Sequence, residues 1–211
     1  GFVPTMGSLH KGHISLIKKS KKKNKKTLVS IFINPNQFDS KKDFQRYPRN
    51  NKNDLLILKK LNVDFVYLPN KKSVYSSKRR KKIKLNKKDQ ILCAKSRKGH
   101  FEGVIDVMDR LTNMVKPNYI FMGEKDFQQL YLVKKFIEKR YKSKIISCKT
   151  IRNNNSLALS SRNLLLKNDE LVRAEKLTKN LFFLKKKLNE IKDITKFLYI
   201  KKNELNKTYG V

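Results

Sequence analysis

The sequence predicts an α/β fold in which helices cover both faces of a parallel β-sheet. Short apolar segments rich in β-branched residues, such as residues 27–33, alternate with segments of helical periodicity. Continuous apolar runs of this kind are typical of strands buried in parallel sheets, and the helices between them are the crossovers that such strands require. Several predicted strands end in glycine and polar residues, at the edge where open α/β sheets bind ligands.

The first strand, turn and helix contain two of the three histidines in the chain. A turn spans residues 4–13, and apolar residues with helical spacing follow it. A helix start exposes unpaired backbone N–H groups and a positive dipole end, which suits phosphate, and Gly7 and Gly12 permit close approach of a ligand. His10 and His13 are expected on one helix face. We interpret this stretch as a nucleotide site; the alternative is a pair of ordinary surface or capping histidines.

The second predicted strand, residues 27–33, ends in a polar loop. Asn34 and Gln37 lie at its carboxyl end and are candidates for hydrogen bonds to a substrate. The alternatives are simple turn chemistry for Asn34 and a solvent-facing Gln37. The chain is then expected to continue as a loop to residue 49, a helix over residues 53–61 and a strand over residues 64–68.

A later strand, residues 118–122, repeats the order of strand, glycine, charged residue and helix start. Lys125 would meet a phosphate as a point charge, and Gln129 would lie about one turn inside a helix that begins near Asp126. The alternative is a charged turn in which Asp126 caps the helix.

Two further segments combine predicted secondary structure with groups suited to anions. Arg97 and His100 precede an amphipathic helix over residues 104–115 and are candidates for contact with an anionic substrate. Residues 160–162 follow a strand expected over residues 144–151, and their two hydroxyls and guanidinium suit charge on phosphates being transferred.

The C-terminal part is predicted to be helical. Apolar residues recur at helical spacing from residue 168 to residue 191, and a second, short helix is expected over residues 194–205. We interpret the apolar stripe as core or as a partner surface rather than as chemistry.

The 211-residue chain is strongly basic, with 52 Lys and Arg against 17 Asp and Glu and a formal net charge of +35. Such a balance suits nucleic acid, a membrane surface or polyanionic substrates. Lysine and asparagine are abundant throughout, however, and tryptophan is absent, as an AT-rich coding sequence would produce. No aromatic platform accompanies the basic cluster at residues 78–82, so we interpret it as an exposed segment rather than as an RNA site.

The two cysteines indicate a reducing compartment. Cys93 and Cys148 are isolated, with neither metal-ligand spacing nor a disulfide framework. No apolar run approaches the roughly 20 residues that span a bilayer, and no signal peptide opens the chain. We therefore expect a cytoplasmic protein with neither a membrane partner nor a specific nucleic acid partner.

Six stretches, taken in order across residues 1–163, resemble the pantoate–β-alanine ligase (pantothenate synthetase) family. They are VPTMG with HKGH (residues 3–7 and 10–13), SIFINPNQF (30–38), YPR (47–49), GHFEGV (99–104), GEKDFQQ (123–129) and LALSSRN (157–163). The resemblance implies a Rossmann-like nucleotidyltransferase fold of the HIGH superfamily and a homodimer. It also implies a nucleotide- and pantoate-binding domain over residues 1–163 and the helical start of an incomplete C-terminal lid domain over residues 164–211.

The reaction that the resemblance implies has two steps. The carboxylate of (R)-pantoate attacks the α-phosphorus of ATP, with Mg²⁺ present, and gives pantoyl adenylate and pyrophosphate. The amine of β-alanine then attacks the activated carbonyl and releases pantothenate and AMP. No covalent enzyme nucleophile is required.

The resemblance also implies roles for particular residues, and no protein ligand for a metal is among them. The catalytic residues would be His10, His13, Lys125 and Arg162, with His13 as the proton donor. The ATP-binding residues would be Met6, Gly7, Ser8, Leu9, His10, Lys11, Gly12, His13, Gly123, Glu124, Lys125, Asp126, Ile151, Leu159, Ser160, Ser161 and Arg162. Pantoate would be bound by Asn34, Gln37 and Gln129, and β-alanine by Gln37.

The sequence departs from the family pattern in three places. The chain looks trimmed before Val3 and after Val211, and Asn155 and Ser156 stand where the family usually has Asp-Gly. A lost glycine is expected to alter that loop. The alternatives to the ligase are another nucleotidylyltransferase of the same fold, a basic RNA-binding protein and a non-catalytic remnant.

Overall fold

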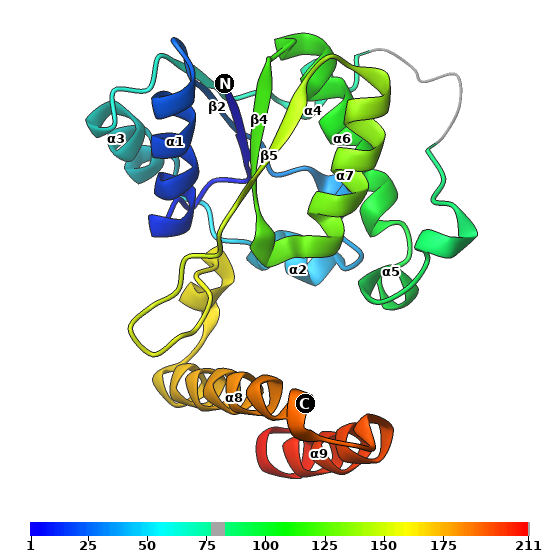
Figure 1. The fold of residues 1–211 in the computed structure, drawn as a ribbon. Helices are drawn as coiled ribbons and strands as arrows, with labels where there is room; N and C mark the ends of the chain where they lie inside the picture. The colour runs from blue at the N-terminus through cyan, green and yellow to red at the C-terminus, as the bar shows by residue number, and fades with distance from the viewer. Residues whose placement is uncertain (77–82, 211) are drawn as a thin grey trace. The chain divides into compact units, whose positions relative to one another are not determined.

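The computed structural model describes residues 1–76 and 83–210, so the basic cluster at residues 78–82 lies outside the described residues (Figure 1). The strands are β1 Phe2–Thr5, β2 Leu28–Ile31, β3 Phe65–Tyr67, β4 Tyr119–Gly123 and β5 Lys144–Cys148. The α-helices are α1 Lys11–Lys23, α2 Lys41–Arg46, α3 Asn51–Lys60, α4 Lys71–Val74, α5 Cys93–Ser96, α6 His100–Val115, α7 Phe127–Arg140, α8 Asn168–Lys187 and α9 Ile194–Tyr209. Short 3-10 helices are η1 Pro35–Gln37, η2 Lys87–Asp89, η3 Glu124–Asp126, η4 Ser161–Leu165 and η5 Leu188–Glu190.

The strands form one parallel sheet in the order β3-β2-β1-β4-β5, which confirms the predicted α/β fold. β1 pairs with β2 from Phe2 opposite Leu28 to Thr5 opposite Ile31, and with β4 through Phe2 opposite Ile120. The chain first adds β2 and β3 on one side of β1 and then β4 and β5 on the other, so the strand order reverses between β1 and β4. Open α/β sheets bind ligands beyond the carboxyl ends of the strands at such a point.

The sheet separates two hydrophobic cores, one on each face. Successive side chains of a strand point to opposite faces, so Phe2 packs with α6 and α7 while the adjacent Val3 packs with α1 and α3. Ile120 and Phe121 of β4 divide between the two cores in the same way. Figure 1 shows α1 and α3 on one face of the sheet and α6 and α7 on the other, as the sequence predicts.

Two elements differ from the sequence prediction for local reasons. Residues 41–46 form α2 where a loop is expected, because the Ser40 hydroxyl accepts the Asp43 N–H and caps a short helix. β5 ends at Cys148 rather than at residue 151, because its neighbour β4 ends at Gly123, directly opposite Cys148. Neither limit can be read from hydrophobic periodicity.

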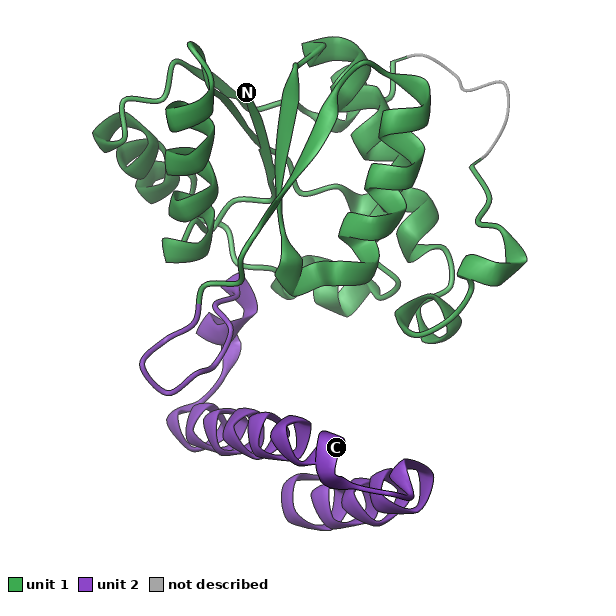
Figure 2. Cartoon of the chain, in the orientation of Figure 1, with its two compact units in different colours: residues 1–151 green, residues 152–211 purple. Residues whose placement is uncertain are grey.

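The chain divides into two compact units, Gly1–Ile151 and Arg152–Val211 (Figure 2). The first contains the sheet, and the second contains α8 and α9. No residue of α8 or α9 is buried, so the apolar stripe forms no buried core in the described chain, and its interpretation as a partner surface stays a prediction. The predicted domain division after residue 163 likewise stays a prediction.

The close approach of α6 to η1 leads to a prediction about stability. A methyl group at Gly103 of α6 would overlap the backbone carbonyl oxygen of Asn36. We expect Gly103→Ala to lower the free energy of unfolding by about 1–3 kcal/mol, because a backbone atom must move. Urea unfolding measures this, with Asn113→Ala at an exposed position of the same helix as the control. Equal stability of the two variants would contradict the packing.

Candidate active site

The loops that follow β1 and β4 lie at the same edge of the sheet. β1 leads through residues 6–10 into α1, and β4 leads through η3 into α7. The two strands are parallel neighbours, so their carboxyl ends are adjacent. The charge of Lys125, in η3, acts on both His10 and His13. The structure therefore brings these three predicted residues together at the point where the strand order reverses.

Side-chain oxygens bind the backbone N–H groups of the loop over residues 6–10. Gly7 and Ser8 both have left-handed backbone conformations, with φ of +78° and +50°. The Gly7 N–H donates to Thr5 Oγ1 at 3.2 Å. The Ser8 and Leu9 N–H groups donate to the two carboxylate oxygens of Asp54, each at 2.7 Å. Thr5 of β1 and Asp54 of α3 thus hold the predicted phosphate loop in place.

Asp54 lies in the first turn of α3 and is not among the residues that the sequence motifs indicate. Its side chain has 0% exposure. The sequence contains one signal for it, because Asp54 stands one helical turn before Leu58, which is also buried. An acidic residue on the apolar face of a helix needs a partner in the interior.

The two histidines form a capping box at the start of α1, with His10 as the N-cap and His13 as the third residue of the helix. His10 Nδ1 accepts the Gly12 N–H at 3.1 Å, and His13 Nδ1 accepts the His10 N–H at 3.3 Å. Their ring centroids are 4.1 Å apart. His10 is therefore the N-cap residue that precedes the helix, and His13, three residues later, lies beside it as the spacing predicts. Lys11, exposed, and Gly12 are the first residues of α1.

Burial lowers the pKa of both imidazoles. Desolvation lowers the pKa of His10, and the charge of Lys125 adds to the effect. Desolvation and the charges of His10 and Lys125 lower the pKa of His13 to about 3. Both rings are therefore neutral at pH 7, and because each Nδ1 accepts a backbone N–H, each ring carries its proton on Nε2. The pair presents two neutral N–H donors, which suit anionic oxygen atoms.

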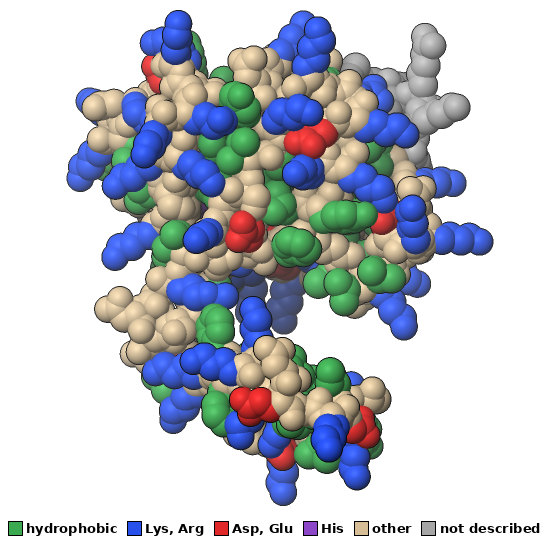
Figure 3. Space-filling model, in the orientation of Figure 1, with side chains coloured by type: hydrophobic (Ala, Val, Ile, Leu, Met, Phe, Trp, Pro, Cys, Tyr) green, Lys and Arg blue, Asp and Glu red, His purple; other side chains and the backbone are tan. Residues whose placement is uncertain are grey.

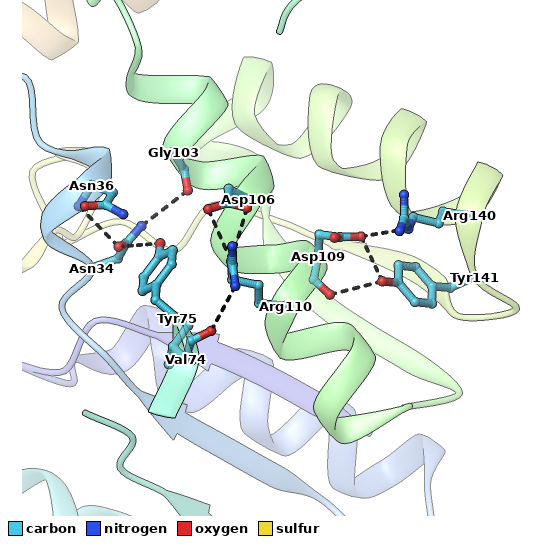
Figure 4. Close-up of polar contacts among 10 residues, drawn as sticks. All are labelled: Asn34, Asn36, Val74, Tyr75, Gly103, Asp106, Asp109, Arg110, Arg140 and Tyr141. Carbon is cyan, nitrogen blue, oxygen red and sulfur yellow. Dashed lines mark hydrogen bonds and ion pairs between the residues drawn. The ribbon is translucent and has the colours of Figure 1, made fainter. Parts of the chain in front are cut away.

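The loop after β2 places Gln37 beside the loop after β1. The Gln37 side-chain amide donates to Met6 Sδ at 3.0 Å. Asn34, with 1% exposure, donates to Gln37 Oε1 at 3.2 Å and to the Gly103 carbonyl at 3.3 Å. Its own oxygen accepts the Asn36 N–H at 3.2 Å and the Tyr75 hydroxyl at 2.9 Å, and Figure 4 shows how these groups surround it.

Both hydrogen-bonding groups of Asn34 are thus used within the protein. Asn34 caps η1, which agrees with the alternative that it is an ordinary turn residue. It also orients Gln37, the residue predicted to bind pantoate. This arrangement favours a positioning role for Asn34, and its direct contact with a substrate stays a prediction.

His100 and Arg97 also support Gln37. His100 Nδ1 lies 2.6 Å from the Gln37 carbonyl oxygen, and Arg97 donates to His100 Nε2 at 3.1 Å. Because an arginine only donates, Nε2 is the acceptor and the Nδ1 proton is donated to Gln37. Arg97 also forms a bidentate ion pair with Asp39, in which Nη2 donates to Oδ1 at 2.9 Å and Nε donates to Oδ2 at 3.2 Å. The structure thus uses both predicted anion contacts to hold the loop that bears Gln37.

The residues after β4 are open to solvent. Lys125 and Asp126 are exposed and form an ion pair at 2.9 Å. Glu124 accepts a hydrogen bond from the Ser147 hydroxyl at 2.5 Å. Asp126 stands at the N-cap position of α7, but its side chain accepts no capping hydrogen bond there, so the capping alternative is not what the structure shows. Gln129 lies half-buried in the first turn of α7.

The remaining predicted ATP-binding residues are divided between the two units. Ile151, half-buried, closes the first unit, whereas Leu159–Arg162 belong to the second. Ser160 Oγ accepts the Arg162 N–H at 3.3 Å and caps η4, and Ser161 is buried. The contribution of these residues to ATP binding stays a prediction.

The loop that precedes these residues has an unusual conformation at the position of the missing glycine. Ser156 has a φ of +70°, in the left-handed region that favours glycine. The side-chain amides of Asn153 and Asn155 donate to the two carboxylate oxygens of Glu175 on α8, at 2.6 Å and 2.8 Å. Glu175 thus binds the loop on either side of its tip.

The surface charge is spread widely. On the face drawn in Figure 3, Lys and Arg side chains are scattered over both units and do not gather in one patch.

The described helices include none long and apolar enough to cross a membrane. Within residues 1–76 and 83–210, no group of three His, Cys, Asp or Glu side chains is arranged to hold a metal ion.

Comparison with known proteins gives one consistent result. The sequence model of the family described as Pantoate-beta-alanine ligase matches residues 1–209. The chain is 41% identical over 189 residues to a pantothenate synthetase of Pseudothermotoga lettingae, a match that covers 86% of this chain and 67% of that protein. It is 44% identical over 179 residues to a pantothenate synthetase of Francisella tularensis subsp. novicida, covering 84% of this chain and 69% of that protein.

Solved structures of the same family have the same fold. The pantoate-β-alanine ligase of Francisella tularensis, complexed with beta-gamma ATP and β-alanine, matches with a TM-score of 0.81 and 43% identity, covering 84% of this chain and 69% of that one. A pantothenate synthetase of Thermus thermophilus matches with a TM-score of 0.89 and 31% identity, covering 97% of this chain and 75% of that one.

The neutral histidines predict a loss of stability in acid. The pKa of His13 is about 3 in the folded protein and ordinarily 6.5, so between these values the unfolded chain binds more protons. Stability present above pH 6.5 is therefore lost as the pH falls, by about 2 kcal/mol between pH 6.5 and pH 5. We expect His13→Asn, whose side-chain oxygen can replace Nδ1 as acceptor, to reduce this loss. Urea unfolding at both pH values measures it, and an equal loss in the variant would refute the assignment.

The conformation of Ser156 predicts a stabilising substitution. Ser156→Gly removes the strain of a left-handed serine and is expected to raise the free energy of unfolding by about 0.5–1 kcal/mol, after the entropy that glycine adds to the unfolded chain. Thermal unfolding measures the change. Asn154→Gly, in the same loop without a left-handed conformation, is the control and is expected to be destabilising. A Ser156→Gly variant that loses stability would contradict the strain.

Proposed function

The chain belongs to the pantoate–β-alanine ligase family, and we propose that it condenses pantoate with β-alanine while ATP is converted to AMP and pyrophosphate. The observation that carries the proposal is the convergence, at the carboxyl edge of the sheet, of the capped histidine pair, Lys125 and Gln37. These groups come from three loops that follow β1, β2 and β4. One loop offers donors to phosphate, and another offers an amide to a small polar substrate.

The first half-reaction joins two anions. A pantoate carboxylate oxygen bonds to the α-phosphorus of ATP, and the bond from that phosphorus to the bridging oxygen breaks to release pyrophosphate. Repulsion opposes the approach, and charge grows on the leaving group. In this proposal the Lys125 ammonium group and the two imidazole N–H donors offset both effects, because donors fixed in advance need no reorganisation as charge develops.

The structure supports a particular role for His13. A pKa of about 3 leaves the imidazole uncharged before ATP binds, so His13 acts first as a hydrogen-bond donor through Nε2. Phosphate oxygens near Nε2 raise the pKa of the ring, because they favour its charged form. With its pKa raised in this way, His13 can bind a proton and donate it toward the negative charge that develops on the pyrophosphate. This role agrees with that of proton donor which the family resemblance implies.

In the second half-reaction the β-alanine amine attacks the acyl carbonyl, the bond to AMP breaks, and the amine loses a proton. Gln37 and Gln129 hold the pantoyl group in this proposal, with Gln37 also near β-alanine. The bonds from Asn34 and His100 fix the orientation of Gln37 before substrate arrives. Such preorganisation lowers the entropic barrier to both steps.

ATP is the nucleotide substrate, and Mg²⁺ accompanies it. Mg²⁺ in phosphoryl-transfer sites commonly takes its ligands from substrate phosphates, water and one or two carboxylates. The described residues provide no cluster of three ligands, so we propose that the triphosphate supplies most of the coordination. A homodimer and a cytoplasmic location, which the sequence analysis predicts, remain part of the proposal.

The site assignment predicts which side chains the first step needs. Lys125→Ala and His13→Ala are each expected to lower the rate of pantoyl adenylate formation by about 10²-fold or more, the scale of a lost electrostatic contact to the transition state. Pyrophosphate release in single-turnover experiments measures the rate. Lys139→Ala, which removes an exposed lysine from α7, is the matched control and is expected to have no effect. Unchanged rates in both site variants would overturn the assignment.

A further inference from the structure

The buried carboxylate of Asp54 has a role that the motifs do not assign. Its side chain has 0% exposure, the lowest of any charged residue in the described chain. A charge taken out of water is strongly unfavourable unless hydrogen bonds or opposite charge compensate it. Here the two N–H bonds of 2.7 Å from Ser8 and Leu9, together with the N-terminal end of the α3 dipole, provide that compensation.

The loop that Asp54 holds contains a serine in a strained conformation. Gly7 and Ser8 are successive left-handed residues, with φ of +78° and +50°, and serine adopts this conformation only at a cost. The conformation turns consecutive N–H groups toward one point, which makes a concave anion site. The Ser8 and Leu9 N–H groups both donate to Asp54 here. A methyl group at Gly7 would lie 3.0 Å from an Asp54 oxygen, so the fit is close as well as polar.

Two consequences follow for the nucleotide. The backbone N–H groups of Ser8 and Leu9 are engaged by Asp54, so any contact of these residues with ATP uses other atoms. The next residue is His10, whose own N–H donates to His13 Nδ1 at 3.3 Å. The position of Leu9 therefore sets where His10 caps the helix, and the His10 N–H in turn orients His13.

We propose that Asp54 is a positioning residue for the proposed ligase reaction, which fixes the loop over residues 6–10 and thereby directs the Nε2 donors of His10 and His13 toward ATP. The inference rests on the proposed function of this site. The competing explanation is that Asp54 only stabilises the fold, as a buried carboxylate does elsewhere in the molecule.

Asp54→Asn separates these explanations. The amide keeps the shape of the carboxylate but has one acceptor oxygen, so one of the two loop N–H groups faces another donor. We expect kcat/KM for ATP to fall by roughly 10²-fold, the scale of a displacement of about 1 Å in a catalytic group. NMR titration is expected to show the pKa of His13 rising from about 3 toward 6.5 as the loop opens to water.

Asp109→Asn is the matched control. Asp109 of α6 has 4% exposure and binds the Tyr141 hydroxyl at 2.8 Å and Arg140 at 3.1 Å, near the start of β5 (Figure 4). This substitution is expected to reduce stability while kcat/KM for ATP and the His13 pKa stay as in the wild type. If Asp54→Asn behaves in the same way, the positioning role is overturned.

Ser8→Gly in the Asp54→Asn background tests the loop conformation directly. Glycine adopts the left-handed conformation without strain, so we expect the double variant to recover part of the kcat/KM that Asp54→Asn loses. If Asp54→Asn does not fold, the double variant is compared with Ser8→Gly alone, and an equal kcat/KM and an equal His13 pKa in these two variants would overturn the proposal. If the wild-type protein releases no pyrophosphate, the proposed function fails, but the His13 titration still decides whether Asp54 holds the histidine pair.

Discussion

Two hydrogen bonds from the Ser8 and Leu9 amides to one buried carboxylate set the geometry on which the rest of the site depends. They hold a loop in a conformation that an isolated chain would avoid, and the residue that follows is the cap of α1. The parallel sheet determines where the site lies, because the strand order reverses between β1 and β4. Asp54 fixes the conformation of the loop within that place. It belongs to α3, which packs on the same face of the sheet as α1.

A second set of contacts prepares the substrate side of the site. Gln37 is held through its carbonyl by His100 and through its side chain by Asn34, while Gly103 allows α6 to approach η1 closely. Both halves of the site thus use buried or half-buried polar groups whose hydrogen bonds are made before any ligand arrives. Neutral histidines fit this pattern, because an uncharged ring is easier to bury than an imidazolium and still donates through Nε2.

The sequence predicts the parts of this arrangement that depend on periodicity and local chemistry. Apolar strands, amphipathic helices and the polar residues at strand ends can be read directly, and they locate His10, Lys125 and Gln37. The partners that hold these residues cannot be read from the sequence in this way. Asp54 lies far along the chain from the loop it holds, and only the fold brings the two together. The left-handed conformation of Ser156 also depends on its loop, although the loss of a family glycine points to that position.

The most direct test of the two-step ligase is pyrophosphate release from ATP and pantoate, in the presence of Mg²⁺, before and after addition of β-alanine. Without β-alanine, the account predicts a burst of about one pyrophosphate per active site, because the adenylate stays bound. Addition of β-alanine should convert the burst into steady turnover with formation of pantothenate and AMP. Folded protein that binds ATP but releases no pyrophosphate would contradict the account.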